Sequence, residues 1–192
     1  MKEFHKLTIS LSTTCLIAAA AIAFVFMITK KPIANQHRLE TLKAVKLALP
    51  VCDNDPVNDK KTLRINNKDM EFYIGKKTGV VNGIAFESSG EGYAGMIKIM
   101  VGINPIGEIT GLEILENQET PGLGTRITKS KFKGQYIGKS FDNSKLVKGE
   151  LAVNKDGGDI DAITGATISS RGVTSAVNKA LEIFEKYKED IL

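Results

Sequence analysis

Cysteine and histidine are scarce in this chain of 192 residues, which contains two of each. Cys15 lies inside an apolar run and Cys52 stands alone in a polar segment, so neither has a partner at the spacing of a metal site or a disulfide framework. The two histidines, His5 and His37, flank the same apolar run. Because the rest of the chain has no histidine, it can form neither a histidine metal site nor a Ser-His-Asp triad. Its redox or binding chemistry therefore has to come from a bound cofactor.

The main part of the chain also lacks an excess of charge. Residues 1–31 hold four lysines and one glutamate, whereas residues 32–192 contain 22 basic and 21 acidic residues. No five consecutive residues carry the same charge. Proteins that bind nucleic acid through its phosphates need a concentrated basic surface, so the composition argues against a nucleic acid as partner.

Residues 7–29 contain no charged side chain. A helix of this length reaches roughly 34 Å at about 1.5 Å per residue, enough for a hydrocarbon core of about 30 Å. A cleaved signal peptide is the alternative, but Phe-Val-Phe-Met at residues 24–27 occupies the place of its small-residue cleavage site. We predict a single membrane anchor in residues 1–31. Two lysines stand on either side of the apolar run, so charge alone does not orient it.

The segment after the anchor is predicted to be a membrane-proximal helix and linker, residues 32–60. Apolar residues follow helical spacing up to Pro50, which ends the pattern, and residues 32–36 are the candidate linker. The apolar positions are Leu39, Leu42, Val45 and Leu49. Residues 52–59 alternate acidic and amide side chains as calcium loops do, but they lack the glycine and the closing glutamate of an EF-hand. We interpret them as a solvated turn.

Residues 61–192 are predicted to form one α+β domain. Short runs rich in Ile, Val and aromatic residues occupy 71–75, 80–87, 95–103 and 108–115, with a further strand at 145–153. The short connections between the first four runs favour an antiparallel sheet. A short helix is expected at 129–136 and a longer one at about 170–189. The longer helix carries one apolar stripe, consisting of Val173, Val177, Ala180, Leu181 and Phe184.

The segment before the last helix, residues 161–170, combines small residues with hydroxyls. It reads as a tight loop that leads into the first turn of the helix, with Ser169 or Ser170 as the N-cap. Unpaired N–H groups and the helix dipole favour an anion such as phosphate at this end. Composition alone indicates no more than a capped helix after a glycine turn.

The order of residues in this loop resembles the flavinylation signature of the FMN-binding domain family. The pattern Asp-x-x-Thr-Gly-Ala-Thr-x-Ser extends over residues 161–169. In this family a flavin transferase joins the phosphate of FMN to a threonine hydroxyl by a phosphoester bond. The resemblance makes Thr167 the acceptor. The remaining marked positions are Asp161, Thr164, Gly165, Ala166 and Ser169. It also implies that Asp161 presents the loop to the transferase, although a carboxylate in an Asx turn would look the same.

A second match lies more than 40 residues earlier, at residues 119–124 with the sequence Glu-Thr-Pro-Gly-Leu-Gly. Its own chemistry predicts a type II turn, with Pro at the second position and Gly at the third. A similar segment occurs at the same place in the FMN-binding domain family. The resemblance implies that four residues of this turn lie near the isoalloxazine ring: Glu119, Thr120, Gly122 and Gly124. Tyr93 offers an aromatic face to the ring, with packing at the rim as the alternative.

The layout of the whole chain is most similar to that of G subunits of Rnf-type ion-pumping complexes, with C subunits of sodium-pumping NADH:quinone reductases as relatives. This resemblance implies an electron relay through covalent FMN, between ferredoxin and NAD, with no catalytic side chain and no metal site. It implies the other subunits, a flavin transferase and the lipid bilayer as partners, and a domain on the extracytoplasmic side of the inner membrane. The alternatives are the quinone-reductase component, a membrane-anchored sensor with a non-covalent ligand, and a structural component with a vestigial domain.

Overall fold

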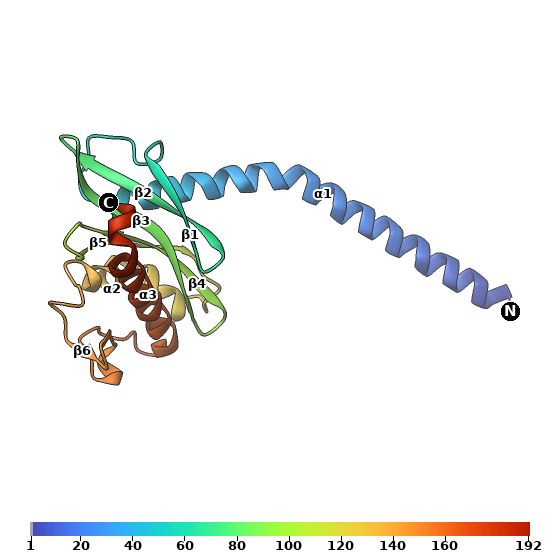
Figure 1. Cartoon of the computed structure of the whole chain (residues 1–192). Helices are drawn as coiled ribbons and strands as arrows, with labels where there is room; N and C mark the ends of the chain where they lie inside the picture. Colours follow the sequence, from blue (N-terminus) through green and yellow to red (C-terminus); the bar gives the residue numbers. More distant parts are fainter. Residues whose placement is uncertain (1) are drawn as a thin grey trace. The chain divides into compact units, whose positions relative to one another are not determined.

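The computed structural model describes residues 2–192, apart from the side chains of Lys2, Glu3, Ala34 and His37. The chain divides into two compact units, residues 1–40 and residues 41–192. One long helix, α1 (Lys2–Ala48), begins in the first unit and ends in the second (Figure 1). The predicted divisions at residues 31 and 60 stay a prediction, and each unit is described by itself below.

The first unit has the length and composition of a membrane span. Its most apolar window has a mean hydropathy of 2.3, and none of that window is buried by the rest of the chain. Large apolar side chains such as Phe24 and Phe26 are more than 60% exposed. The prediction of a linker at residues 32–36 is wrong, because Pro32 lies inside α1. A proline in a helix removes one hydrogen bond, and here the helix continues on both sides of that gap.

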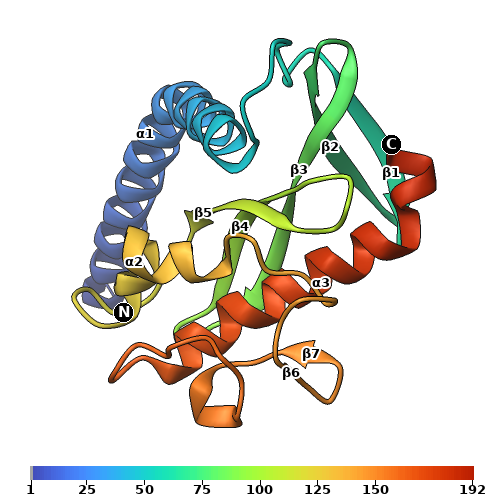
Figure 2. The ribbon, with the colours of Figure 1, turned by 90° about the vertical axis from the view of Figure 1, so that its left-hand side faces the viewer.

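The second unit is built on a five-stranded antiparallel sheet in the order β1-β2-β3-β4-β5 (Figure 2). The strands are β1 (Lys60–Ile65), β2 (Lys68–Lys77), β3 (Val80–Glu91), β4 (Met96–Ile103) and β5 (Ile109–Glu116). The prediction of an antiparallel sheet is confirmed. Sequence analysis missed β1, which a two-residue hairpin joins to β2. Both turn residues, Asn66 and Asn67, have positive φ, as a type I′ turn requires.

The helix α3 (Thr167–Ile191) packs on one face of the sheet, against β3 and β4. All five residues of the predicted apolar stripe are buried, so this part of the prediction is confirmed. The backbones come unusually close where Gly90 on β3 faces Gly172 on α3. A Cβ atom on Gly90 would lie 2.0 Å from the carbonyl oxygen of Gly172. Only glycine at this position allows the helix to approach the strand so closely.

The last turns of α1 cover the opposite face of the sheet. Ala44, Val45, Ala48 and Leu49 form a buried cluster with Tyr73, Ala85 and Met100 from three strands. The Thr110 hydroxyl on β5 donates a hydrogen bond to the carbonyl oxygen of Ala48 at 2.8 Å. The predicted stripe begins later than expected, because Leu39 is 52% exposed. The central strands are therefore buried on both faces.

Tyr73 in this cluster gives the domain a measurable sensitivity to alkali. Burial raises the pKa of Tyr73 from 10.0 to about 12, and the hydrogen bond from its hydroxyl to Glu71 acts in the same direction. The unfolded chain would ionise this tyrosine near pH 10, so its contribution to stability is complete below pH 10 and is lost as the pH rises to about 12. We expect Tyr73→Phe to reduce the fall in unfolding free energy over this range, measured by chemical denaturation. An unchanged fall in the variant would contradict this assignment.

The chain between β5 and α3 is mostly short helical turns and one small hairpin. It contains η1 (Gly124–Thr128), α2 (Ser130–Lys133), η2 (Gly134–Tyr136), β6 (Leu146–Val147), β7 (Glu150–Leu151) and η3 (Asn154–Asp156). The predicted helix at 129–136 is thus an α-turn followed by a 3-10 turn, with Phe132 and Tyr136 buried. The prediction of one strand at 145–153 is wrong. Lys148 and Gly149 have positive φ and form the hairpin turn between β6 and β7.

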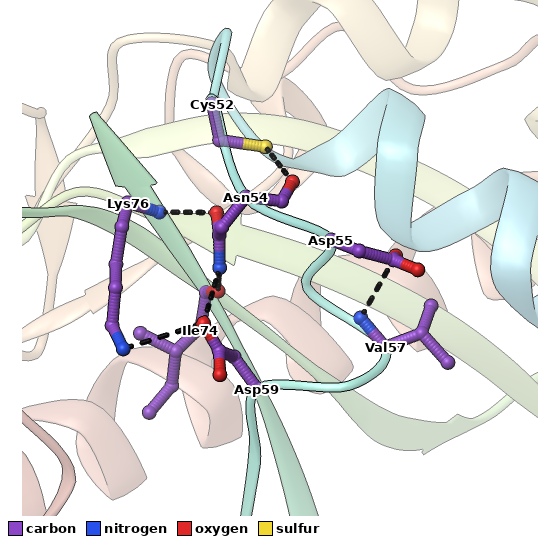
Figure 3. A network of polar contacts seen from close by, with 7 residues as sticks. All are labelled: Cys52, Asn54, Asp55, Val57, Asp59, Ile74 and Lys76. Carbon is purple, nitrogen blue, oxygen red and sulfur yellow. Dashed lines mark hydrogen bonds and ion pairs between the residues drawn. The ribbon is translucent and has the colours of Figure 1, made fainter. Parts of the chain in front are cut away.

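The acidic loop at residues 52–59 uses its polar groups to join itself to β2 (Figure 3). The Asn54 amide nitrogen donates to Asp59 at 2.9 Å and to the carbonyl oxygen of Ile74 at 2.8 Å, while its oxygen accepts from the N–H of Lys76 at 2.7 Å. The Lys76 ammonium group also pairs with Asp59 at 3.3 Å. These contacts make the loop a hydrogen-bonded connection between α1 and the sheet.

Candidate functional site

A cavity of about 560 Å³ lies where the turn after β3, the turn after β5 and the start of α3 meet. Ten residues line it: Tyr93, Glu119, Thr120, Leu123, Gly124, Gly165, Ala166, Thr167, Ile168 and Ser169. Eight of them belong to the set that sequence analysis predicted. The two motifs, separated by more than 40 residues in the sequence, therefore form facing walls of one cavity. Its volume falls within the range of small-molecule sites, roughly 300–1,000 Å³.

The first wall is the Pro-Gly turn after β5. Leu123 donates its N–H to the carbonyl oxygen of Thr120 at 3.2 Å, and Gly122 has φ of 78°. Both features match the predicted type II turn. Leu123 then reaches across to the other wall, since a Cβ atom on Gly165 would lie 3.4 Å from a Leu123 methyl carbon. The two motif loops thus come close together at Gly165 and Leu123.

The second wall is the loop that opens α3. Gly165 takes a left-handed conformation with φ of 81°, and α3 starts two residues later at Thr167. The prediction of Ser169 or Ser170 as the N-cap is wrong, because Ala166 is the cap and no side chain caps the helix. As at every helix start, the first N–H groups of α3, beginning at Thr167, have no acceptor within the helix, and here no side-chain cap bonds to them. They provide a positive end to the helix at Thr167, a residue that is partly exposed.

The hydroxyl groups of the two serines have other partners. The Ser170 hydroxyl accepts a hydrogen bond from the N–H of Ile163 and donates to the carbonyl oxygen of Ala166, both at 3.0 Å. These bonds close the loop on the helix. The Ser169 hydroxyl donates to Glu119 at 2.5 Å, which connects the helix to the other wall. A tertiary contact has therefore taken the Ser169 hydroxyl and the local backbone has taken the Ser170 hydroxyl, so neither serine caps the helix.

Three apolar side chains surround the mouth of the cavity. Tyr93 is 70% exposed, and Leu123 and Ile168 are each 47% exposed. Exposed apolar side chains around a cavity are typical of a site that receives a flat or aromatic ligand. Sequence analysis missed Leu123 and Ile168. Both lie inside the quoted motifs, and their apolar character next to glycine and hydroxyl residues was the available signal.

Three predicted site residues do not line the cavity. Gly122 lies at the outer side of the turn, and nothing comes within 4 Å of a Cβ atom built on it. Thr164 is exposed. Asp161 is exposed and accepts a hydrogen bond from the Asn154 amide at 3.0 Å.

An ion pair supports the start of α3 from the outer side. Arg171, one helical turn after Thr167, donates two hydrogen bonds to the Asp156 carboxylate, at 2.7 and 2.6 Å. The hydrogen bond from Arg171 lowers the pKa of Asp156, and the same contact raises the pKa of Arg171. The pair joins η3 to the first turns of α3 by two charge-assisted hydrogen bonds.

Both walls of the cavity lie in a part of the chain that matches a known family. The FMN-binding domain family matches residues 92–182, which include both walls. The chain is 32% identical to the G subunit of the ion-translocating oxidoreductase complex of Aliivibrio fischeri, covering 100% of this chain and 95% of the relative. The chain therefore belongs to the family of G subunits of ion-translocating oxidoreductase complexes.

Further relatives agree with this assignment. The chain is 32% identical to the G subunit of the proton-translocating ferredoxin:NAD(+) oxidoreductase complex of Clostridium ljungdahlii, over 94% of this chain and 91% of that one. Among solved structures it is similar to the C subunit of the Na(+)-translocating NADH-quinone reductase of Parabacteroides distasonis, with a TM-score of 0.52 and 24% identity, over 70% of this chain and 67% of that one. This second likeness confirms the α+β fold.

Proposed function

We propose that Thr167 carries FMN through a phosphoester bond and that the domain relays electrons between ferredoxin and NAD inside an ion-translocating membrane complex. The observation that supports it best is the position of Thr167, which is the first residue of α3 and lines the cavity formed by both motifs. Membership of the family of G subunits and the name of the Clostridium relative support the electron route.

The residues of the cavity fit such a group. The Thr167 oxygen would hold FMN through its phosphate, by a phosphoester bond that replaces the hydroxyl proton of the threonine and the leaving group of an activated flavin nucleotide. The first N–H groups of α3 then stabilise the remaining phosphate charge. Tyr93, Leu123 and Ile168 supply apolar contact for a flat ring, and Gly124 and Gly165 allow backbone to approach it. Bound FMN supplies the electron transfer, and the chain supplies its position and surroundings.

The proposal extends to the membrane. We place the domain outside the cytoplasm, with residues 7–29 of α1 as its single span and a flavin transferase as the enzyme that modifies it. Covalent attachment suits that location, since a released cofactor would diffuse away. Protease added to spheroplasts, whose outer envelope has been removed while the inner membrane stays sealed, should digest the domain. Digestion only after permeabilisation would overturn the placement.

Acid denaturation tests the covalent bond directly. The full-length chain is expressed with its flavin transferase, purified in detergent and precipitated with acid. We expect the yellow, fluorescent flavin to remain with the polypeptide, because a phosphoester survives the loss of the fold. Release of all flavin into the supernatant would show a non-covalent ligand and would contradict the proposal.

A further inference from the structure

The Glu119 carboxylate is the only charged group among the ten residues that line the cavity, and the residue is 4% exposed. One carboxylate oxygen accepts hydrogen bonds from the N–H groups of Tyr93 and Ala94, at 2.8 and 3.2 Å. The other oxygen accepts the hydroxyl of Ser169 at 2.5 Å. Of the roughly four acceptor positions on a carboxylate, three are thus occupied by partners within the chain.

Two glycines make room for this carboxylate. A Cβ atom on Gly92 would lie 2.3 Å from one oxygen of Glu119, and a Cβ atom on Gly124 would lie 2.5 Å from the other. Any larger residue at either position would displace the carboxylate from its three donors. The surroundings of Glu119 therefore fit its carboxylate closely. Glu119 belongs to the segment of the Pro-Gly turn, and it bonds to the two other segments of the cavity.

We propose that Glu119 is a positioning residue, which holds the Tyr93 turn and the first turn of α3 in place so that Thr167 is presented for modification. This inference rests on the proposed function of Thr167. Ser169 lies two residues after Thr167, so the bond from Ser169 to Glu119 fixes the direction in which α3 begins. The bonds to Tyr93 and Ala94 fix the opposite wall. Glu119 acts on the flavin through the residues that it holds.

The rate of flavin attachment to Thr167 distinguishes this role from a direct effect of the negative charge. Glu119→Ala removes all three hydrogen bonds, and we expect attachment to slow by roughly tenfold. Glu119→Gln can keep them, since its amide oxygen accepts from the two N–H groups and its amide nitrogen donates to the Ser169 oxygen. We expect the Gln variant to be modified within about twofold of the wild-type rate. A Gln variant as slow as the Ala variant would overturn the inference.

Three more variants test the connection through Ser169. Ser169→Ala should slow attachment. The double variant with Glu119→Ala should be no slower than Glu119→Ala alone, because both changes remove the same hydrogen bond between Ser169 and Glu119. Ser88→Ala is the matched control. Its buried hydroxyl donates to the Ala176 carbonyl oxygen at 2.7 Å, also between the sheet and α3 but away from the cavity. The control should be modified at the wild-type rate.

Hydrogen exchange supplies a measurement that does not depend on flavin. In the unmodified full-length chain, the N–H groups of Tyr93 and Ala94 should exchange faster in Glu119→Ala than in the wild type. In Ser88→Ala they should exchange at the wild-type rate. Equal exchange in all three proteins would overturn the positioning role, whether or not Thr167 is the acceptor. If the wild type were never modified at Thr167, the proposed function would fail, and faster exchange in Glu119→Ala would still support the tie.

Discussion

Thr167→Ala is expected to abolish flavin attachment completely while leaving the domain folded. The substitution removes the only atom that can form the bond to phosphorus at this position, so attachment is lost even if the loop keeps its shape. Alanine is a good helix former and Thr167 is the first residue of α3, so the helix should still form. Intact-mass analysis after expression with the transferase should show the wild type heavier by FMN less one water and the variant at its unmodified mass.

Two other variants make this result specific. Thr164→Ala changes an exposed residue outside the cavity and should still be modified. Thr167→Ser keeps a hydroxyl at the same place and should accept flavin at a reduced rate. Attachment that persists in Thr167→Ala, or that disappears in Thr164→Ala, would place the acceptor elsewhere in the loop.

Gly90→Ala should strongly destabilise the domain. The added methyl carbon would lie 2.0 Å from the carbonyl oxygen of Gly172 and 3.0 Å from the backbone nitrogen of Ala176. Neither atom belongs to a flexible side chain, so α3 would have to move away from β3. Overpacking of this kind costs about 3 kcal/mol or more when backbone must shift. Thermal unfolding of the purified chain should show a large drop in stability, together with reduced flavin attachment because α3 carries Thr167.

The matched control is Gly134→Ala. Gly134 has helical backbone angles, φ of −60° and ψ of −20°, and nothing lies within 4 Å of a Cβ atom built on it. The substitution should leave stability within about 0.5 kcal/mol of the wild type or raise it slightly, because alanine restricts the unfolded chain. A similar loss of stability in both variants would show that the contact between β3 and α3 is not the cause.

The strands in the middle of the sheet could be predicted because burial on one or both faces leaves a clear apolar pattern. The outer strand β1 was missed, since its sequence Lys-Lys-Thr-Leu-Arg-Ile faces solvent for most of its length. The signal was in the turn, where Asn66 and Asn67 suit positive φ at both positions. Pro32 gave the opposite error. A local rule placed a break there, but the helix-forming residues on both sides carry α1 through it.

The candidate site shows the same division. The two motifs contain most of the cavity residues. These could be predicted because a turn and a helix start depend on local sequence. The roles of Glu119 and Ser169 depend on a contact between residues 50 positions apart, which no local pattern contains. A hydroxyl at the start of a helix indicates a cap when the chain is read locally. In the folded domain the buried carboxylate is the stronger partner for Ser169, and the helix begins without a side-chain cap.

The most direct test of the account is peptide mapping of the wild-type chain purified in its assembled complex. Trypsin should release residues 156–171, which contain Thr164, Thr167 and both serines of the loop. Fragmentation of this peptide by tandem mass spectrometry should place one flavin phosphoester on Thr167. An unmodified peptide from a fully active complex would contradict the claim that this threonine carries the electron-transferring flavin.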